Sequence, residues 1–348
     1  MGGYFGLFVA VSDETNIYKF LFCFRFTLKM EQRHLLHCTV YSSAVSACGE
    51  FLAVGNNFGD VSVLDFNLKS LSSSKPKLIN CFSAHIGPVY ALLGINNTLI
   101  SAGLGPVLIW NWKDIVSFDP KPVHKLEACG PKASITCLCY DKKHGLLFAG
   151  IEDSSIMIWD LSNLSCCKKL TGHTQYIHDI CLLSDSLASA SEDGLVKIWD
   201  THNNKCTKTI KPSNWNELKR PSLGSWIGCV ASDSSTEWIV LGGGPAPALW
   251  HTRSTSMALP LNSSNEAQSF IPFTLHFYGD EIVGGGNDSM LHRWTSNGEQ
   301  KAAVPCAISN IFSINFASEN SLPAILTGTG HKIQLFTNLG YEGPCISL

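Results

Sequence analysis

A short apolar pattern that ends in an aromatic residue recurs along the chain, and it constrains the fold more than any other feature. Residues 155–160 (SIMIWD) and 195–200 (LVKIWD) end alike, with Trp159 and Trp199 at the same place in each. Equivalent endings occur at Leu64, Trp110, Trp250, Trp294 and Phe336. From Leu64 to Phe336, successive endings are 46, 49, 40, 51, 44 and 42 residues apart. A period of this length indicates repeated supersecondary units rather than two ordinary domains.

Each unit has an interior typical of antiparallel strands. In the clearest unit, apolar runs at 177–182 and 186–190 precede Asp193-Gly194 and the strand that ends at Trp199. Asp-Gly favours a tight hairpin because glycine adopts positive φ without steric cost. We interpret the glycine runs 242–244 and 284–286 as the same turn in other units. The sequence therefore predicts an all-β, seven-bladed β-propeller whose recurring Trp residues pack between blades.

The predicted propeller occupies residues 31–348 as a single domain. Residues 1–30 form an N-terminal extension to which we assign no structure, and one interpretation is an extended start with Met30 as the alternative initiator. The apolar run at 4–11 is far too short to cross a membrane. Two ways of closing the ring stay open: the strand at 345–348 closes it alone, or the apolar segment 18–26 is the last outer strand instead.

Composition restricts the classes of function. The chain has 25 Lys and Arg against 28 Asp and Glu, so its formal net charge is -3. Because phosphate binding needs a basic excess, an independent nucleic-acid binder is disfavoured. Only 15% of residues are charged and 45% are hydrophobic, which excludes a disordered protein. The 14 cysteines show no disulfide spacing and favour a reducing, intracellular compartment.

Two dipeptides place the repeats in a known family. Gly172-His173 and Trp199-Asp200 are the pair that marks WD repeats, and Ala84-His85 is a weaker version of the first. On these dipeptides and on the period, the chain resembles the WD-repeat β-propeller family. The resemblance implies one complete structural hydrogen-bond set, in the fourth unit, made of His173, Ser189, Asp193 and Trp199.

His173, Ser189 and Asp193 are also the residue types of a hydrolase triad. Nucleophilic catalysis needs an exposed serine beside an oxyanion hole, and no G-x-S-x-G motif is present. No histidine or cysteine spacing fits a zinc site, and no glycine-rich stretch matches a phosphate-binding loop. We therefore expect no catalytic activity, no cofactor and no metal.

The connection between the fourth and fifth units is unusually long. Residues 201–225 show no strand-like alternation and carry Trp215, Arg220 and Pro221. Trp and Arg are the residue types that anchor protein interfaces. In the alternative interpretation the connection folds back on its own propeller, with Trp215 covering a blade edge. Trp112 allows the same two interpretations.

A closer resemblance rests on longer stretches. They are 51–57 (FLAVGNN), 85–90 (HIGPVY), 170–178 (LTGHTQYIH), 220–221 (RP), 226–229 (WIGC), 242–246 (GGGPA), 249–251 (LWH) and 336–341 (FTNLGY). From about residue 39 to the C-terminus, the chain resembles the WD-repeat family that supplies the sixth subunit of the THO complex.

This resemblance implies a nuclear, non-enzymatic scaffold in the assembly that couples transcription and mRNA processing to nuclear export. The implied partners are other THO subunits, which are helical or coiled-coil proteins, and mRNA export factors. Any RNA contact would be indirect, and no membrane is involved. We predict that the partner-binding residues, or their support, are Trp215, Arg220, Pro221, Trp226, Trp250 and His251.

A second function fits the same fold. Many WD-repeat proteins are substrate receptors of cullin-RING ubiquitin ligases, and they resemble one another in a W-D-x-R ending. Here Trp159-Asp160 and Trp199-Asp200 lack the arginine, while Trp250 has Arg253 but lacks the aspartate. The ligase receptor is therefore the alternative function, ahead of a hydrolase or a direct RNA binder.

Overall fold

The computed structural model describes residues 37–66, 76–127, 133–261, 270–318 and 321–348. The extension 1–30 and the apolar segment 18–26 lie outside these residues. Thr39–Leu348 form one compact unit. Among the described residues, no helix combines the length and the apolar character needed to cross a bilayer.

Within the described residues, 28 strands form seven four-stranded antiparallel sheets, each built in chain order. The first three sheets contain β1 (Val40–Val45), β2 (Phe51–Asn56), β3 (Asp60–Asp65) and β4 (Lys77–Ser83); β5 (Ala91–Ile95), β6 (Thr98–Ala102), β7 (Val107–Asn111) and β8 (Pro122–Leu126); β9 (Ile135–Asp141), β10 (Leu146–Ile151), β11 (Ser155–Asp160) and β12 (Ser165–Thr171). The fourth and fifth contain β13 (Ile177–Leu183), β14 (Ser186–Ser191), β15 (Val196–Asp200) and β16 (Lys205–Ile210); β17 (Ile227–Ser232), β18 (Trp238–Gly243), β19 (Ala248–His251) and β20 (Met257–Pro260). The last two contain β21 (Pro272–Tyr278), β22 (Glu281–Gly286), β23 (Met290–Thr295) and β24 (Gln300–Pro305); β25 (Ile311–Ser318), β26 (Ser321–Gly328), β27 (Lys332–Phe336) and β28 (Cys345–Ser347).

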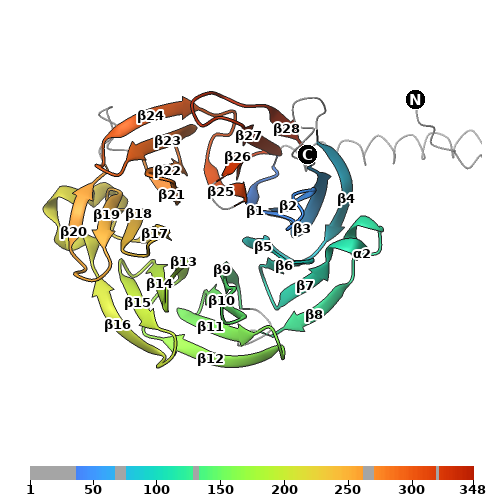
Figure 1. The fold of residues 1–348 in the computed structure, drawn as a ribbon, viewed down its shortest axis with the longest axis horizontal. Coiled ribbons are helices and arrows are strands. Elements are labelled where there is room, and N and C mark those ends of the chain that lie inside the picture. Colours follow the sequence, from blue (N-terminus) through green and yellow to red (C-terminus); the bar gives the residue numbers. More distant parts are fainter. Residues whose placement is uncertain (1–36, 67–75, 128–132, 262–269, 319–320) are drawn as a thin grey trace, which may run out of the picture. The chain divides into compact units, whose positions relative to one another are not determined.

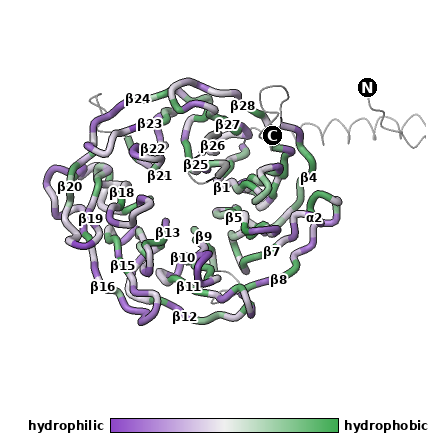
Figure 2. The backbone as a smooth tube through the Cα atoms, in the orientation of Figure 1, coloured by the Kyte–Doolittle hydropathy of each residue, from purple (hydrophilic) through white to green (hydrophobic). Residues whose placement is uncertain are grey.

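The seven sheets stand around a ring, with the first strand of each sheet at the centre and the fourth at the rim (Figure 1). The predicted seven-bladed β-propeller is therefore confirmed. In Figure 2, hydrophobic and hydrophilic residues alternate in short stretches all along the tube, as expected when every blade contributes to the core. Asn315 in the seventh blade donates hydrogen bonds to the carbonyl and hydroxyl oxygens of Ser43 in the first, at 2.8 and 2.7 Å.

The recurring aromatic residues lie on the third strand of their blades and face the neighbouring blade. Trp199 is opposite Leu187 in its own sheet, and it packs with Phe148 and Ile158 of the preceding blade. Trp159, Trp199, Trp250 and Trp294 are almost entirely buried. Large flat side chains at one repeated position thus fill the wedge between adjacent twisted sheets.

The repeated apolar pattern in the sequence did not predict the outer strands of the blades. Residues 201–225 were expected to form a connection without strands, but β16 occupies 205–210 and pairs with β15. Five of its six residues are exposed or only half-buried, because a rim strand faces solvent on most sides. Its sequence therefore lacks the apolar alternation that marks a half-buried strand.

The glycine runs are another correction. Gly242, Gly284 and Gly285 lie inside β18 and β22, not in hairpin turns. A Cβ at Gly285 would lie 2.5 Å from Ile311 of the next blade, and one at Gly242 would lie 2.4 Å from Pro272. These glycines are needed for close approach between blades. The Asp193-Gly194 turn was predicted correctly, with Gly194 at φ 79°.

The second blade carries a short helix that the sequence did not reveal. Helix α2 (Trp112–Val116) begins at Asn111, whose side chain accepts a hydrogen bond from the Lys113 amide at 3.0 Å. Trp112 is 3% exposed and stacks on Phe51 of the first blade. Of the two interpretations offered for Trp112, the structure shows the one in which it packs on its own propeller.

The seventh blade consists of four consecutive strands from the C-terminal part of the chain, and β28 is its outer strand. The C-terminal segment thus fills the position for which two alternatives were considered.

Candidate partner-binding surface

In every sheet the four strands follow one another in chain order, so the connections between strands lie on two opposite faces of the propeller. First and third strands run one way and second and fourth strands the other, so connections between blades share one face with the second-to-third hairpins. We call this the mouth face; it carries residues 84–90, 172–176 and 211–226. The opposite face carries the first-to-second and third-to-fourth turns, among them 252–256 and 337–344.

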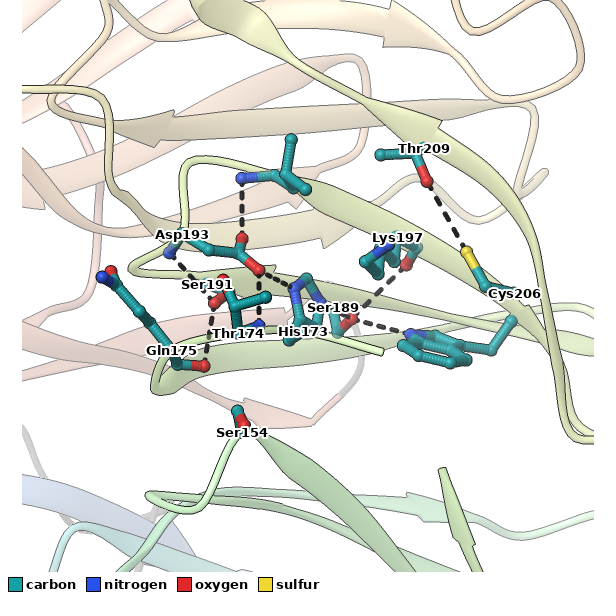
Figure 3. Close-up of polar contacts among 12 residues, drawn as sticks. Ser154, His173, Thr174, Gln175, Ser189, Ser191, Asp193, Lys197, Cys206 and Thr209 are labelled. Atoms are coloured by element: carbon teal, nitrogen blue, oxygen red, sulfur yellow. Dashed lines mark hydrogen bonds and ion pairs between the residues drawn. The ribbon is translucent and has the colours of Figure 1, made fainter. Parts of the chain in front are cut away.

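Three residues of the implied structural set, His173, Ser189 and Asp193, come together beneath the mouth face (Figure 3), and Trp199 joins them through Ser189. His173 Nδ1 lies 2.8 Å from Asp193 Oδ2, and His173 Nε2 lies 2.7 Å from Ser189 Oγ. Trp199 Nε1 donates to Ser189 Oγ at 2.8 Å. With the proton on Nδ1, the donors run in one direction from Trp199 through Ser189 to His173 and on to Asp193.

Burial decides what this set can do chemically. Ser189 is 0% exposed, so no substrate can reach its hydroxyl in this structure. Burial opposes ionisation of Asp193, but hydrogen bonds from His173 and from the Thr174 and Leu195 amides outweigh it and lower the carboxyl pKa. An ionised carboxylate that receives these bonds ties the inter-blade loop to the hairpin of its own blade.

The second blade contains most of the same arrangement, which sequence reasoning missed. His85 Nε2 lies 2.9 Å from Ser101 Oγ, and Trp110 Nε1 donates to the same oxygen at 2.9 Å. Histidine and serine are 16 residues apart in both blades, and this equal spacing was the available signal. Gly105 stands where the fourth blade has Asp193, so the acid is absent here.

The connection from β16 to β17 folds into three short 3-10 turns, η1 (Pro212–Asn214), η2 (Asn216–Leu218) and η3 (Pro221–Leu223). Trp215 lies edge-on to Trp250, with ring centroids 4.7 Å apart, and Leu218 is fully buried. The connection is therefore folded back on the propeller, and Trp215 covers the core at this blade.

Arg220 fastens the same connection to the fifth blade. Its guanidinium donates to the carbonyls of Gly243, Gly244 and Pro245 at 2.6–2.8 Å, and also to the carbonyl of Phe270. Two stretches of the closer resemblance, 220–221 and 242–246, thus meet at one clamp although they are far apart in sequence. Close approach at Gly244, where a Cβ would lie 2.5 Å from the Gly224 carbonyl, requires the glycine.

Pro221 and Trp226 continue the connection toward the centre of the mouth face. Pro221 is exposed and begins η3. Trp226 is half-buried, and its Nε1 donates to the Leu223 carbonyl at 2.9 Å. Its ring lies over Gly228, where an added Cβ would be 2.5 Å from the indole.

The remaining predicted residues lie elsewhere. Trp250 is 0% exposed, so it can support a surface but cannot touch a partner. His251 is at the end of β19 that leads to the opposite face, where its ring packs against Trp238 at 5.1 Å. The structure therefore groups Trp215, Arg220, Pro221 and Trp226 on the mouth face and separates His251 from them.

A repeated irregularity in the inner strands surrounds the centre of this face. Strand pairing shifts by one residue near the start of β1, β9, β13, β17, β21 and β25. A bulge of this kind re-aims the extra side chain. The residues at the shifted position, and the equivalent residue just before β5, are Tyr41, Tyr90, Thr136, His178, Gly228, Phe273 and Phe312.

These seven residues all line a central cavity of about 420 Å³. Four of them are aromatic, and Trp226 covers the position that Gly228 leaves empty. We call Tyr41, Tyr90, Phe273, Phe312 and Trp226 the aromatic collar. In each unit, the residue at the shifted position directly follows the apolar residue near the start of the inner strand. Aligning these residue pairs across the seven units would have revealed the pattern from the sequence.

Asp179, on β13, contributes a carboxyl group to the wall of the central cavity. Its two oxygens accept hydrogen bonds from the Ile180 and Val230 amides, both at 2.9 Å. Burial raises the pKa of this carboxyl to about 7, although the two hydrogen bonds oppose the shift. Burial also lowers the pKa of His276, on the same wall, to about 4.

The raised pKa of Asp179 predicts how stability depends on pH. A carboxyl whose pKa is higher in the folded state stabilises the fold fully below its unfolded value of 3.8, and this contribution is lost as pH rises through about 7. Urea unfolding of wild type and Asp179→Asn at about pH 5 and about pH 8 checks this. The free energy of unfolding of wild type should fall relative to that of the variant as pH rises. If the difference between the two free energies of unfolding is the same at both pH values, the prediction is wrong. The other titratable groups near this carboxyl are Tyr41, Tyr90, His178, His276, Cys137, Cys139, Cys181 and Cys229.

Metal binding and disulfide formation depend on how the His, Cys, Asp and Glu side chains of the described residues are grouped. Among the residues that the structure describes, no group of three or more His, Cys, Asp or Glu could hold a metal ion. The cysteines described there are free thiols, and burial raises the pKa of Cys139 to about 12.

The seven-bladed ring and its histidine–serine–tryptophan hydrogen bonds define a WD-repeat β-propeller protein. The WD domain, G-beta repeat family matches residues 120–160 and 164–200, which include β9–β11 and β12–β15.

Similarity to whole proteins is more specific. THO complex subunit 6 of Homo sapiens is 34% identical over 331 residues, covering 90% of this chain and 93% of the human protein. The Danio rerio homolog is 32% identical over 90% of this chain and 98% of its own length. The Arabidopsis thaliana protein of the same name is 27% identical over 67% of each. The chain belongs to the THO complex subunit 6 family.

Proposed function

We propose that this chain is a non-enzymatic adaptor subunit of a nuclear THO complex, which binds other THO subunits and supports coupled mRNA processing and nuclear export. The observation that carries the proposal is similarity over 90% of the chain to proteins named THO complex subunit 6. The buried state of Ser189 and the net charge of -3 support an adaptor rather than a hydrolase or an independent RNA binder.

The mouth face is the proposed docking surface for other THO subunits. Pro221 is exposed and Trp226 half-buried there, and both belong to the closer resemblance. Ile86 is 95% exposed and Tyr176 is 50% exposed on connections of the same face. Arg220, Trp215 and the buried Trp250 would hold this surface in place.

Replacing Trp226 by alanine tests the docking surface. Because Trp226 is partly exposed and caps a glycine, we expect the variant to fold but to recover other THO subunits about tenfold less well, a loss typical of an interface tryptophan. The measurement is affinity purification from nuclear extract with RNase present. Tyr341→Ala, at an exposed tyrosine on the opposite face, is the matched control.

The same purification separates the proposed function from its alternatives. RNase-resistant recovery of THO subunits with wild type supports the adaptor. Recovery of ubiquitin-ligase adaptor proteins without THO subunits would overturn it. Recovery that disappears with RNase would show that RNA, not protein contact, holds the complex. Trp226→Ala that is folded and recovers THO subunits at the wild-type level would remove this residue from the docking surface.

A further inference from the structure

The central cavity is the feature of this molecule that the proposed docking surface does not explain. It is lined from all seven blades, and a second pocket of about 350 Å³ adjoins it between Trp226 and Phe273. Pockets of several hundred Å³ with a few convergent polar groups are typical ligand sites. The two pockets share His178, Gly228 and Phe273, so they form one continuous depression at the mouth face.

The aromatic collar gives this depression a nearly continuous rim of ring faces and edges. Tyr41 lies 5.5 Å from Tyr90 and 5.3 Å from Phe312, measured between ring centroids. Phe312 lies 5.2 Å from Phe273, and Trp226 follows over Gly228. Aromatic faces carry a negative electrostatic potential and attract cations, with tryptophan the strongest.

The depression has acidic side chains but no Lys or Arg to match them. Asp179 lines the cavity, and Glu192 lines the adjoining pocket, where it lies 2.7 Å from His178. Among the residues lining the two pockets, none is Lys or Arg. Burial raises the pKa of the Tyr90 hydroxyl, and Tyr41 and the carboxylate of Glu152 add to this shift. An anionic phosphate is therefore disfavoured here and a cation is favoured.

The carboxyl oxygens of Asp179 can still accept hydrogen bonds from such a cation. Each of its oxygens accepts one backbone hydrogen bond, and each can accept another. A guanidinium or ammonium group bound between this carboxylate and the collar would make charge-assisted hydrogen bonds and contact aromatic faces at once.

We propose that the cavity and its aromatic collar form a binding site for one basic side chain, arginine or lysine, presented by an extended segment of a partner protein. The apolar stem of the side chain would pass between the rings, and its charged end would reach Asp179. This inference goes beyond membership of a THO complex, because the site would bind a basic peptide whether or not THO subunits dock on the same face.

The test starts from a random seven-residue peptide library displayed on phage, selected on the purified wild-type protein. We expect selected sequences to share an Arg or Lys at one position and to lose that residue when selection is repeated on Asp179→Asn. The strongest peptide is then synthesised with Arg, Lys, citrulline or Glu at that position and titrated by calorimetry. Citrulline, which keeps the shape of arginine but not its charge, should bind at least about tenfold more weakly. The Arg and Lys peptides decide which cation the site prefers.

Two further variants protect the test against misfolding. Phe312→Leu removes one ring of the collar without touching Asp179, and it should weaken the Arg or Lys peptide about tenfold. Tyr341→Leu, on the opposite face, should leave peptide binding unchanged. Circular dichroism and a urea midpoint for each variant identify any that fail to fold.

Several results would overturn the proposal. They are selection of acidic or purely apolar peptides, no enrichment at all, equal binding of the citrulline peptide, or displacement of the peptide by an oligouridine RNA. THO subunits that still co-purify while no basic peptide binds would reject this site and leave the proposed function intact. Peptide binding without THO subunits would do the reverse.

Discussion

Replacing Arg220 with alanine is expected to lower the free energy of unfolding by about 2–4 kcal/mol. The guanidinium donates to four main-chain carbonyls, and the residues that carry those carbonyls are buried. Without the side chain, these acceptors lose a charged donor that water cannot easily replace. The connection from β16 to β17 would also lose its attachment to the fifth blade. Urea unfolding followed by tryptophan fluorescence measures the change.

Two other variants show whether the clamp, rather than the charge, is responsible. Arg220→Lys keeps the charge but lacks the planar fork, so it should recover only part of the lost stability. Arg253→Ala removes an arginine whose side chain is 79% exposed and which pairs with Glu237 at 3.5 Å. That change should stay within about 0.5 kcal/mol. If Arg220→Ala were as mild as Arg253→Ala, the four hydrogen bonds would contribute nothing measurable.

Ser189→Ala should be destabilising by about 2–4 kcal/mol although it removes a single oxygen atom. That oxygen bonds both His173 Nε2 and Trp199 Nε1, and all three residues are buried. Each nitrogen would be left without its partner in a region that water does not reach. The same unfolding measurement checks this prediction.

The second blade provides a comparison for the fourth. Ser101→Ala breaks the equivalent bonds of His85 and Trp110, so it should also destabilise the fold by at least about 1 kcal/mol. Ser234→Ala, at an exposed serine of the turn between β17 and β18, should change stability by no more than about 0.5 kcal/mol. A Ser189→Ala variant as stable as Ser234→Ala would show that the buried set is energetically neutral.

The two predictions separate what is readable in the sequence from what is not. His173, Ser189, Asp193 and Trp199 can be grouped from the sequence alone, because a repeat motif assigns each a place in one unit. Arg220 stands out in the sequence only as a candidate interface residue. Its acceptors lie 23–50 residues away in sequence, and no local pattern announces a main-chain carbonyl as a partner.

The outer strands and the glycines also show what could not be predicted from the sequence. The sequence pattern failed for β16 because solvent faces most of its residues, so apolar alternation had no reason to exist there. The glycines of β18 and β22 were placed in turns, whereas the side chains of the next blade decide that no Cβ fits. The first error comes from exposure to solvent and the second from contacts between blades, and a search for apolar patterns within one unit detects neither.

By itself, the sequence determined the number of blades, the position of the inter-blade tryptophans and the absence of the known catalytic and metal-binding motifs sought. These features follow from patterns that repeat within about fifty residues, where side-chain burial leaves a local periodicity. Only the tertiary structure decided that Trp215 folds back on the propeller, that Arg220 is a clamp, and that rings from four blades and one connection gather at the depression that Asp179 lines. A ring brings one residue from each unit to a common centre, and that geometry exists only after all seven blades have closed.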